Sequence, residues 1–226
     1  MRPELRRVGN GQNPVVMVDG FSGALDRVLN IADALAPYPP QTSYYPGVRR
    51  VIGPDDAADK YVEETCERAA QFIGGAFDIG AFDLIEASFS IVTRRPSELS
   101  PRQRAPHFDT TDPKHLALLH YLRVPPGSGT AFYRQRSTGI ERVGEDNLAT
   151  FVSNAKAEAA RLAPDSGYIN GSDAFYEQIG AVEAVPDRLI IYQGSLLHSG
   201  IIPHDMKFSA DPREGRLTAN LFVRGQ

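Results

Sequence analysis

Short runs of apolar residues, spread along the chain, predict several buried strands. Residues 82–93 alternate between apolar and polar positions, as a half-buried strand does. Residues 188–192 form a continuous apolar run that ends in a glycine-marked turn, and residues 215–223 place polar side chains on one face and apolar ones on the other. Residues 14–19 predict one further strand near the N-terminus.

Helical spacing of apolar residues occurs mainly before residue 81. Residues 22–36 carry an apolar stripe and stop before Pro37, and a second helix is expected from residue 57 to about 73, capped by Asp55 or Asp56. Residues 1–81 are therefore expected to be a mainly helical support. Three other segments complete the pattern: residues 37–53 as an ordered loop, 154–163 as a helix, and 167–180 as a surface lid or binding loop.

Composition narrows the class of protein without identifying it. The 226 residues are 42% hydrophobic and 23% charged, which are ordinary values for a globular domain. A net charge of −4 gives no electrostatic reason to expect nucleic acid. A single cysteine, Cys66, cannot form an internal disulfide, and no run of 18 apolar residues is present. We therefore expect a cytoplasmic protein with no membrane association; the sequence gives no indication of its oligomeric state.

The triplet His107-Phe108-Asp109 and the distant His198 form the main candidate site. A histidine and an aspartate separated by one residue on an extended segment project from the same side of the chain, so both can bind one ion. Two imidazoles and one carboxylate on one face of an octahedral metal leave positions open for other ligands, as in non-heme iron oxygenases. The alternative is that the histidines are ordinary hydrogen-bonded core residues.

Arg216, Thr218 and Asn220 share one face of the last predicted strand. A buried guanidinium needs a partner, and its planar fork suits a carboxylate held by two parallel hydrogen bonds. That carboxylate could belong to a bound ligand, with the Thr218 hydroxyl assisting. It could equally belong to an internal aspartate or glutamate.

These elements together resemble the iron(II)/2-oxoglutarate-dependent oxygenase superfamily, in particular its prolyl-hydroxylase-like branch and a little-characterised bacterial family. The resemblance implies a mainly β fold with flanking helices, built on a double-stranded β-helix of the jelly-roll or cupin type. It implies Fe(II) bound by His107, Asp109 and His198, and 2-oxoglutarate anchored by Arg216 and Thr218. Residues 116–122 resemble the strand after His-x-Asp in that branch, where a tyrosine often contacts the same carboxylate; Tyr121 occupies that position.

The resemblance covers about residues 82–224 of what is expected to be one domain, residues 1–226. Two departures stand out. Eighteen positions separate His198 from Arg216 because residues 202–213 form an extra polar loop, which makes Arg213 a competitor for the anchoring role. Residues 134–187 are long for a link between core strands and are expected to be an insertion over the mouth of the site. Either insertion could act as a lid.

The implied activity is hydroxylation of an unactivated C–H bond in a small molecule, such as an amino acid or a natural-product intermediate, with O2 as second cosubstrate. Cyclisation and desaturation remain open. Residues that could contact the substrate are Arg104, Thr130, Tyr133 and Asn220, whereas His120 is expected to be structural. Two other classes of function also remain: an oxygen-independent, cupin-like isomerase or hydrolase, and a non-catalytic ligand-binding barrel.

Overall fold

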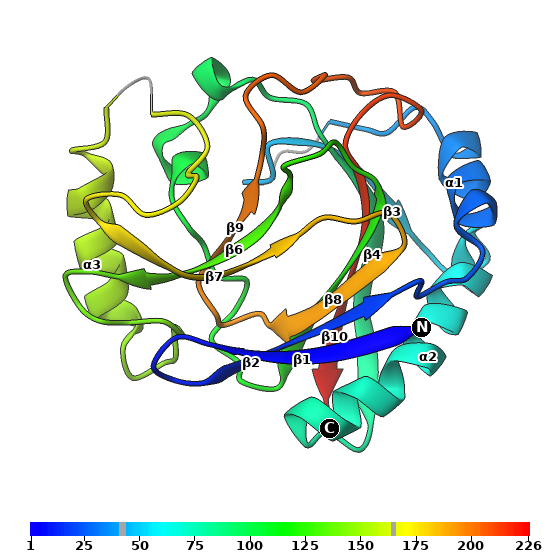
Figure 1. Cartoon of the computed structure of the whole chain (residues 1–226), viewed down its shortest axis with the longest axis horizontal. Helices are drawn as coiled ribbons and strands as arrows, with labels where there is room; N and C mark the ends of the chain where they lie inside the picture. Colours follow the sequence, from blue (N-terminus) through cyan, green and yellow to red (C-terminus); the bar gives the residue numbers. More distant parts are fainter. Residues whose placement is uncertain (41–43, 164–165) are drawn as a thin grey trace.

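Two antiparallel sheets face each other in the computed structural model, which describes residues 1–40, 44–163 and 166–226 (Figure 1). The major sheet contains, in spatial order, β1 (Arg2–Val8), β2 (Asn13–Asp19), β8 (Arg188–Gln193), β5 (His115–Arg123), β10 (Leu217–Gly225), β4 (Phe82–Val92) and β3 (Gly47–Ile52). The minor sheet contains β7 (Tyr176–Glu183), β6 (Gly129–Gln135) and β9 (His198–Ile201). This is the expected mainly β, double-stranded β-helix architecture.

Helices cover the outer faces of both sheets. α1 (Leu25–Ala34) and α2 (Asp59–Phe77) lie on the major sheet, and α3 (Leu148–Ala159) lies beside the minor sheet on the opposite side of the molecule (Figure 1). Two short 3₁₀ turns, Pro96–Glu98 and Pro101–Arg104, precede the His107 segment. No helix in the described ranges is long and apolar enough to cross a membrane.

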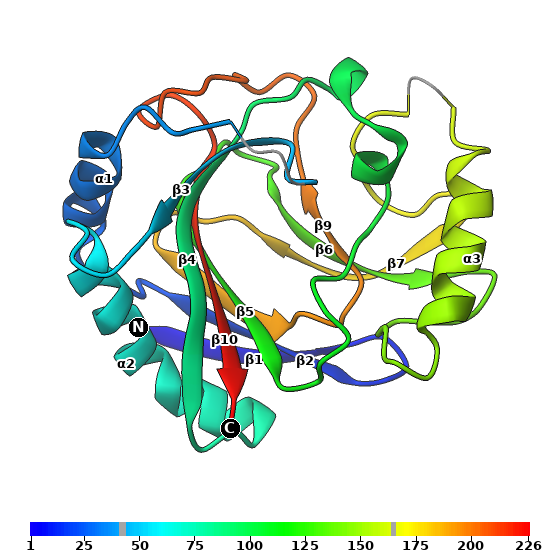
Figure 2. The same cartoon turned by 180° about the vertical axis from the view of Figure 1, so that it is seen from behind.

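Alternation along the strands separates an outer apolar face from a more polar inner face. On β10, Leu217, Ala219 and Leu221 join the outer core under α1 and α2, so Thr218 and Asn220 point to the inner side of the sheet. A second apolar cluster lies on the inner side and includes Tyr121 and Phe132. Seen from behind, β4 and β10 lie in front of this interior (Figure 2).

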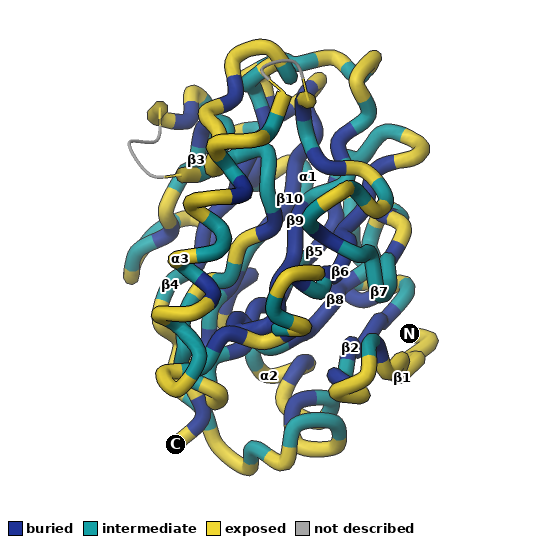
Figure 3. The backbone as a smooth tube through the Cα atoms, turned by 90° about the vertical axis from the view of Figure 1, so that its left-hand side faces the viewer, coloured by how far each residue is buried: buried dark blue, intermediate teal, exposed yellow. Residues whose placement is uncertain are grey.

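The N-terminal region differs from the expected helical support. The predicted strand at 14–19 and both predicted helices are present, but residues 1–81 also supply the two edge strands of the major sheet, β1 and β3. β1 is exposed along nearly its whole length (Figure 3), so it has no alternation to detect. The expected loop at 37–53 contains β3; residues 41–43 of it lie outside the described residues.

The long segment between β6 and β8 contains regular structure. The expected helix at 154–163 begins earlier, as α3, and the expected loop at 167–180 ends within β7. β7 pairs with β6 from Gly129↔Glu183 to Gln135↔Tyr176, so part of this apparent insertion belongs to the minor sheet itself. Pairing partners that lie far apart in sequence explain why local pattern did not identify this strand.

Asp187 joins the N-terminal loop to the barrel at the start of β8. Its carboxylate accepts hydrogen bonds from the Ser22 backbone N–H at 2.9 Å, the Ser22 hydroxyl at 2.6 Å and His120 Nε2 at 3.0 Å. The other ring nitrogen of His120 accepts from the Tyr61 hydroxyl at 2.8 Å, on α2. His120 is therefore fully satisfied as a structural residue, as the sequence predicts. Asp187 has a left-handed φ of 63°, which asparagine also tolerates.

The Asp187→Asn variant should lose about 2–3 kcal/mol of unfolding free energy near neutral pH, because the amide cannot accept all of these hydrogen bonds. Burial tends to raise the pKa of Asp187, but hydrogen bonds from His120 and Ser22 outweigh it and lower the pKa to about 2. The stabilisation is complete above the unfolded-state pKa of about 3.9 and is lost as pH falls toward 2. Urea unfolding at about pH 7 and pH 3 measures this, with exposed Asp205→Asn as control. An equal loss at both pH values would contradict the ionic origin.

Candidate metal centre

Main-chain hydrogen bonds bring the distant candidate residues together. His107 N–H donates to the His198 carbonyl at 2.9 Å, and His198 N–H donates back to the His107 carbonyl at 2.8 Å. Asp109 N–H donates to the carbonyl of Gly194, the residue that follows β8, at 2.7 Å. The His107 segment therefore extends the minor sheet by one bridge. The backbone fixes the positions from which all three side chains project.

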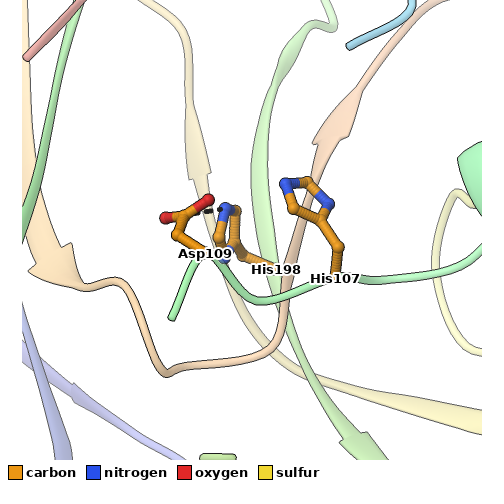
Figure 4. Close-up of side chains that lie close together, drawn as sticks. All are labelled: His107, Asp109 and His198. Carbon is orange, nitrogen blue, oxygen red and sulfur yellow. Dashed lines mark ion pairs between the residues drawn. The ribbon is translucent and has the colours of Figure 1, made fainter. Parts of the chain in front are cut away.

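The side chains of His107, Asp109 and His198 converge, with one potential ligand atom from each residue within 4.8 Å of the others (Figure 4). His198 Nε2 lies 3.8 Å from Asp109 Oδ2, and the two imidazole centroids are 4.3 Å apart. Phe108 packs away from this group against Phe151 of α3. The alternation His-Phe-Asp thus separates two polar ligands from one apolar anchor.

The protonation states of the two histidines suit metal binding. Desolvation lowers the pKa of His198 to about 4, and desolvation followed by the charge of His198 lowers that of His107 to about 4. By solvent accessibility His107 and Asp109 are exposed residues, whereas His198 is buried. His198 Nδ1 donates to the Leu196 carbonyl at 2.8 Å, which leaves Nε2 with its lone pair facing Asp109. Burial raises the pKa of Asp109, which a bound cation would counteract.

A second polar group lies on the inner face of the major sheet. Arg216 is only 5% exposed; among the described residues its Nε has no hydrogen-bond partner, and its Nη2 donates to the Gly129 carbonyl at 3.4 Å. Within the described residues, no carboxylate forms an ion pair with Arg216. Its guanidinium carbon lies 5.9 Å from the centroid of the Tyr121 ring. The internal ion pair that the sequence left open is therefore absent from the described structure.

Several hydroxyl-bearing residues lie on the same inner surface as Arg216. Thr218 is directly opposite Tyr121 across β10 and β5, and the Tyr121 hydroxyl is 2.7 Å from Thr130 Oγ1 on the minor sheet. Asn220 continues the row, with its Nδ2 donating to Ser90 at 2.7 Å. The structure thus places Thr218, Tyr121 and Thr130 near Arg216, with Asn220 farther along the same inner face.

Three other candidates lie elsewhere. Arg213 forms an exposed ion pair with Asp211 and contacts the Asp33 carbonyl, so it does not compete with Arg216. Arg104 donates to the Ala163 carbonyl in the turn after α3. Tyr133 packs in the cluster between the minor sheet and α3, on the opposite face of β6 from Thr130. The expectation that Arg104 and Tyr133 contact substrate stays a prediction.

Two residues near the site were not identified from the sequence. Tyr192 lies on the inner face of β8, and its ring makes an edge contact with His198 at 4.8 Å between centroids. Arg49 lies on β3, and its positive charge contributes to lowering the pKa of Asp109 after the larger effects of His107 and His115. Because successive side chains of a strand point to opposite faces, the position of Tyr192 in β8 could have indicated that it points to the interior. Arg49 could not be found because β3 itself was not predicted.

Gly194 is required by the close approach of the chain to the site. A Cβ at this position would lie 2.6 Å from His115 Nδ1 and 3.3 Å from Asp109 Oδ2. The His115 ring cannot easily yield, because it stacks on Phe222 with 5.4 Å between centroids. A side chain here would therefore displace Asp109 or the loop that holds it.

The Gly194→Ala variant should bind a divalent metal about 10- to 100-fold more weakly than the wild type, a range typical of disturbed ligand support. Titration with Co(II), followed by visible absorption or calorimetry, measures the change. Gly53→Ala is the matched control, because a Cβ there meets nothing within 4 Å. Unchanged Co(II) affinity in Gly194→Ala would show that Asp109 is not held in this way.

Solved structures of low sequence identity share the fold. The iron-bound HygX of Streptomyces hygroscopicus is 11% identical with a TM-score of 0.55, over 95% of this chain and 83% of that one. AviO1 of Streptomyces viridochromogenes Tue57 is 13% identical with a TM-score of 0.53, over 94% and 90%. A Pseudomonas putida prolyl-4-hydroxylase is 14% identical with a TM-score of 0.50, over 96% and 95%. The resemblance to 2-oxoglutarate–Fe(II) oxygenases is thus confirmed at the level of the fold.

Comparison at the level of sequence gives a narrower result. No curated protein matches the chain. The family described as "Family of unknown function (DUF6445)" matches residues 1–223, almost the whole length of the chain. The chain therefore belongs to the DUF6445 family.

Proposed function

We propose that this protein is a non-heme Fe(II)/2-oxoglutarate-dependent oxygenase that acts on a small molecule. The observation that carries the proposal is the buried guanidinium of Arg216, which has no carboxylate partner among the described residues and lies on the inner face of a barrel that also holds the His107–Asp109–His198 group. The group of two histidines and one aspartate alone would suit many metal proteins. Combined with the guanidinium, it provides a metal site and a separate carboxylate site in one interior, as a chelating dicarboxylate requires.

His107, Asp109 and His198 would hold the metal. Two imidazole nitrogens and one carboxylate oxygen favour a borderline divalent ion such as Fe(II) and leave coordination positions for other ligands. The Leu196 carbonyl, by accepting from His198 Nδ1, orients that ring and raises the basicity of Nε2. The donor set and its supporting contacts are thus compatible with iron.

Arg216 would hold the distal carboxylate of 2-oxoglutarate. A guanidinium buried without a counter-ion is costly, and a bidentate carboxylate offsets the cost with two charge-assisted hydrogen bonds. The hydroxyls of Thr218 and Tyr121 lie on the same inner surface and can donate to that carboxylate. This arrangement orients an anionic ligand with its other end toward the metal.

Iron with 2-oxoglutarate and O2 supplies an oxidant strong enough to attack an unactivated C–H bond, and hydroxylation is the proposed outcome. The protein's role is to position the ligands and to exclude water. Fold relatives differ in their reactions, since SnoN is described as an epimerase. HygX has been crystallised with nickel, 2-oxoglutarate and hygromycin B, which supports a small-molecule substrate for this fold.

The proposal predicts that Arg216→Ala weakens 2-oxoglutarate binding about 100-fold or more while metal affinity stays unchanged, because a charge-assisted bidentate contact is lost. Anaerobic titration of the Fe(II)-loaded protein with 2-oxoglutarate, followed by the visible charge-transfer band, measures this. Arg213→Ala is the matched arginine control, and His107→Ala should abolish the band by removing a ligand. Wild-type protein that binds metal but shows no 2-oxoglutarate affinity would instead favour an oxygen-independent metalloenzyme.

A further inference from the structure

Tyr192 is held rigidly at the inner surface of β8. The residue is 4% exposed, and its ring makes edge contacts with Phe132 at 5.3 Å and with His198 at 4.8 Å between centroids. Its neighbours across the sheet are Ala117 of β5 and Val15 of β2, and the small Ala117 leaves room on one side of the ring. The Tyr192 side chain is therefore held by Phe132 and His198 and is not blocked on the side of Ala117.

The hydroxyl of Tyr192 has no hydrogen-bond partner among residues 1–40, 44–163 and 166–226, in contrast to three other buried tyrosines. The hydroxyls of Tyr38, Tyr61 and Tyr121 bond to the Ala32 carbonyl, His120 and Thr130 respectively. The hydroxyl of Tyr133 also has no partner but is sealed from solvent, whereas the hydroxyl of Tyr192 keeps some exposure to solvent. The Tyr192 hydroxyl therefore faces accessible space.

Tyr192 lies on the same inner face as Tyr121 and contacts the candidate metal ligand His198. Along the paired strands β5 and β8, Tyr192 is opposite Ala117 and Tyr121 is opposite Arg188, so the two tyrosines mark opposite ends of one inner face. Tyr192 contacts the metal ligand His198, and its hydroxyl interacts electrostatically with both Asp109 and Tyr121. Tyr121 in turn lies beside Arg216. A ligand that extends from the metal to Arg216 would therefore pass Tyr192 at its metal end.

We propose that the Tyr192 hydroxyl donates a hydrogen bond to the carboxylate of 2-oxoglutarate nearest the metal, while Arg216 holds the distal carboxylate. This inference rests on the proposed function. The hydroxyl is free to donate, and a hydrogen bond to an anionic oxygen is stronger than one to a neutral acceptor. Because Phe132 and His198 already hold the ring, little side-chain entropy would be lost on binding. Tyr192 would thereby select a ligand with a carboxylate at each end.

The Tyr192→Phe variant tests this contact, since it removes only the hydroxyl and keeps the ring against His198. Anaerobic calorimetry would measure Co(II) affinity first and then the affinity of the Co(II)-loaded protein for 2-oxoglutarate. We expect about 10- to 100-fold weaker 2-oxoglutarate binding, the loss of one hydrogen bond to a charged group. Co(II) affinity should not change.

Tyr133→Phe is the matched control, because it deletes an unpaired tyrosine hydroxyl on the outer face of the minor sheet. It should change 2-oxoglutarate affinity less than about twofold, which is within ordinary variation for a distant site. If Tyr192→Phe instead weakens Co(II) binding itself, the hydroxyl acts on the metal ligands and the inference is wrong.

The remaining outcomes separate the two proposals. Equal 2-oxoglutarate affinity in the wild type and Tyr192→Phe would overturn the role of Tyr192 and leave the oxygenase proposal standing. Failure of the Co(II)-loaded wild type to bind 2-oxoglutarate at all would overturn both. Because Arg216→Ala reports on the distal carboxylate, combining it with Tyr192→Phe should give losses that approximately add if the two residues bind opposite ends.

Discussion

The reciprocal main-chain hydrogen bonds between His107 and His198 are the constraint on which the site depends. They join a segment before β5 to the first residue of β9 and so place two imidazoles with 4.3 Å between centroids. Asp109 is tied in the same way to Gly194, whose lack of a side chain lets the two segments approach. The three ligand positions are therefore set by sheet geometry, which is more rigid than a free loop.

The two faces of the major sheet differ in polarity: the outer face packs under helices, and the inner face lines the interior of the barrel. Its outer face is a continuous apolar layer under α1 and α2, which stabilises the fold. Its inner face carries the hydroxyls and the buried guanidinium of Arg216 that the proposed dicarboxylate would satisfy. A polar interior of this kind costs stability without a ligand, as expected where function rather than packing determines the residues. Asp187 and His120 show the contrasting case, since their polar groups are fully paired and serve the fold.

Local signals identified much of the barrel and failed where strands lacked an apolar pattern. The strands near residues 14–19, 82–93 and 188–192 were predictable because at least one face of each packs in the core. β1 was not, because an exposed edge strand of charged residues resembles a loop. β7 was hidden in an apparent insertion because its place in the minor sheet depends on pairing with β6, about 50 residues away in sequence.

The sequence by itself determined the types of candidate ligand, since His-x-Asp on an extended segment must present both groups to one side and a buried arginine must find an anion. Only the tertiary structure decided which partners exist. It placed His198 beside His107, showed no internal carboxylate paired with Arg216 among the described residues, and paired Arg213 with Asp211 instead. It also brought Tyr192 into contact with His198, a candidate metal ligand. The chemical groups of a residue follow from its type alone, whereas the distances between residues depend on pairings between strands that lie far apart in the chain.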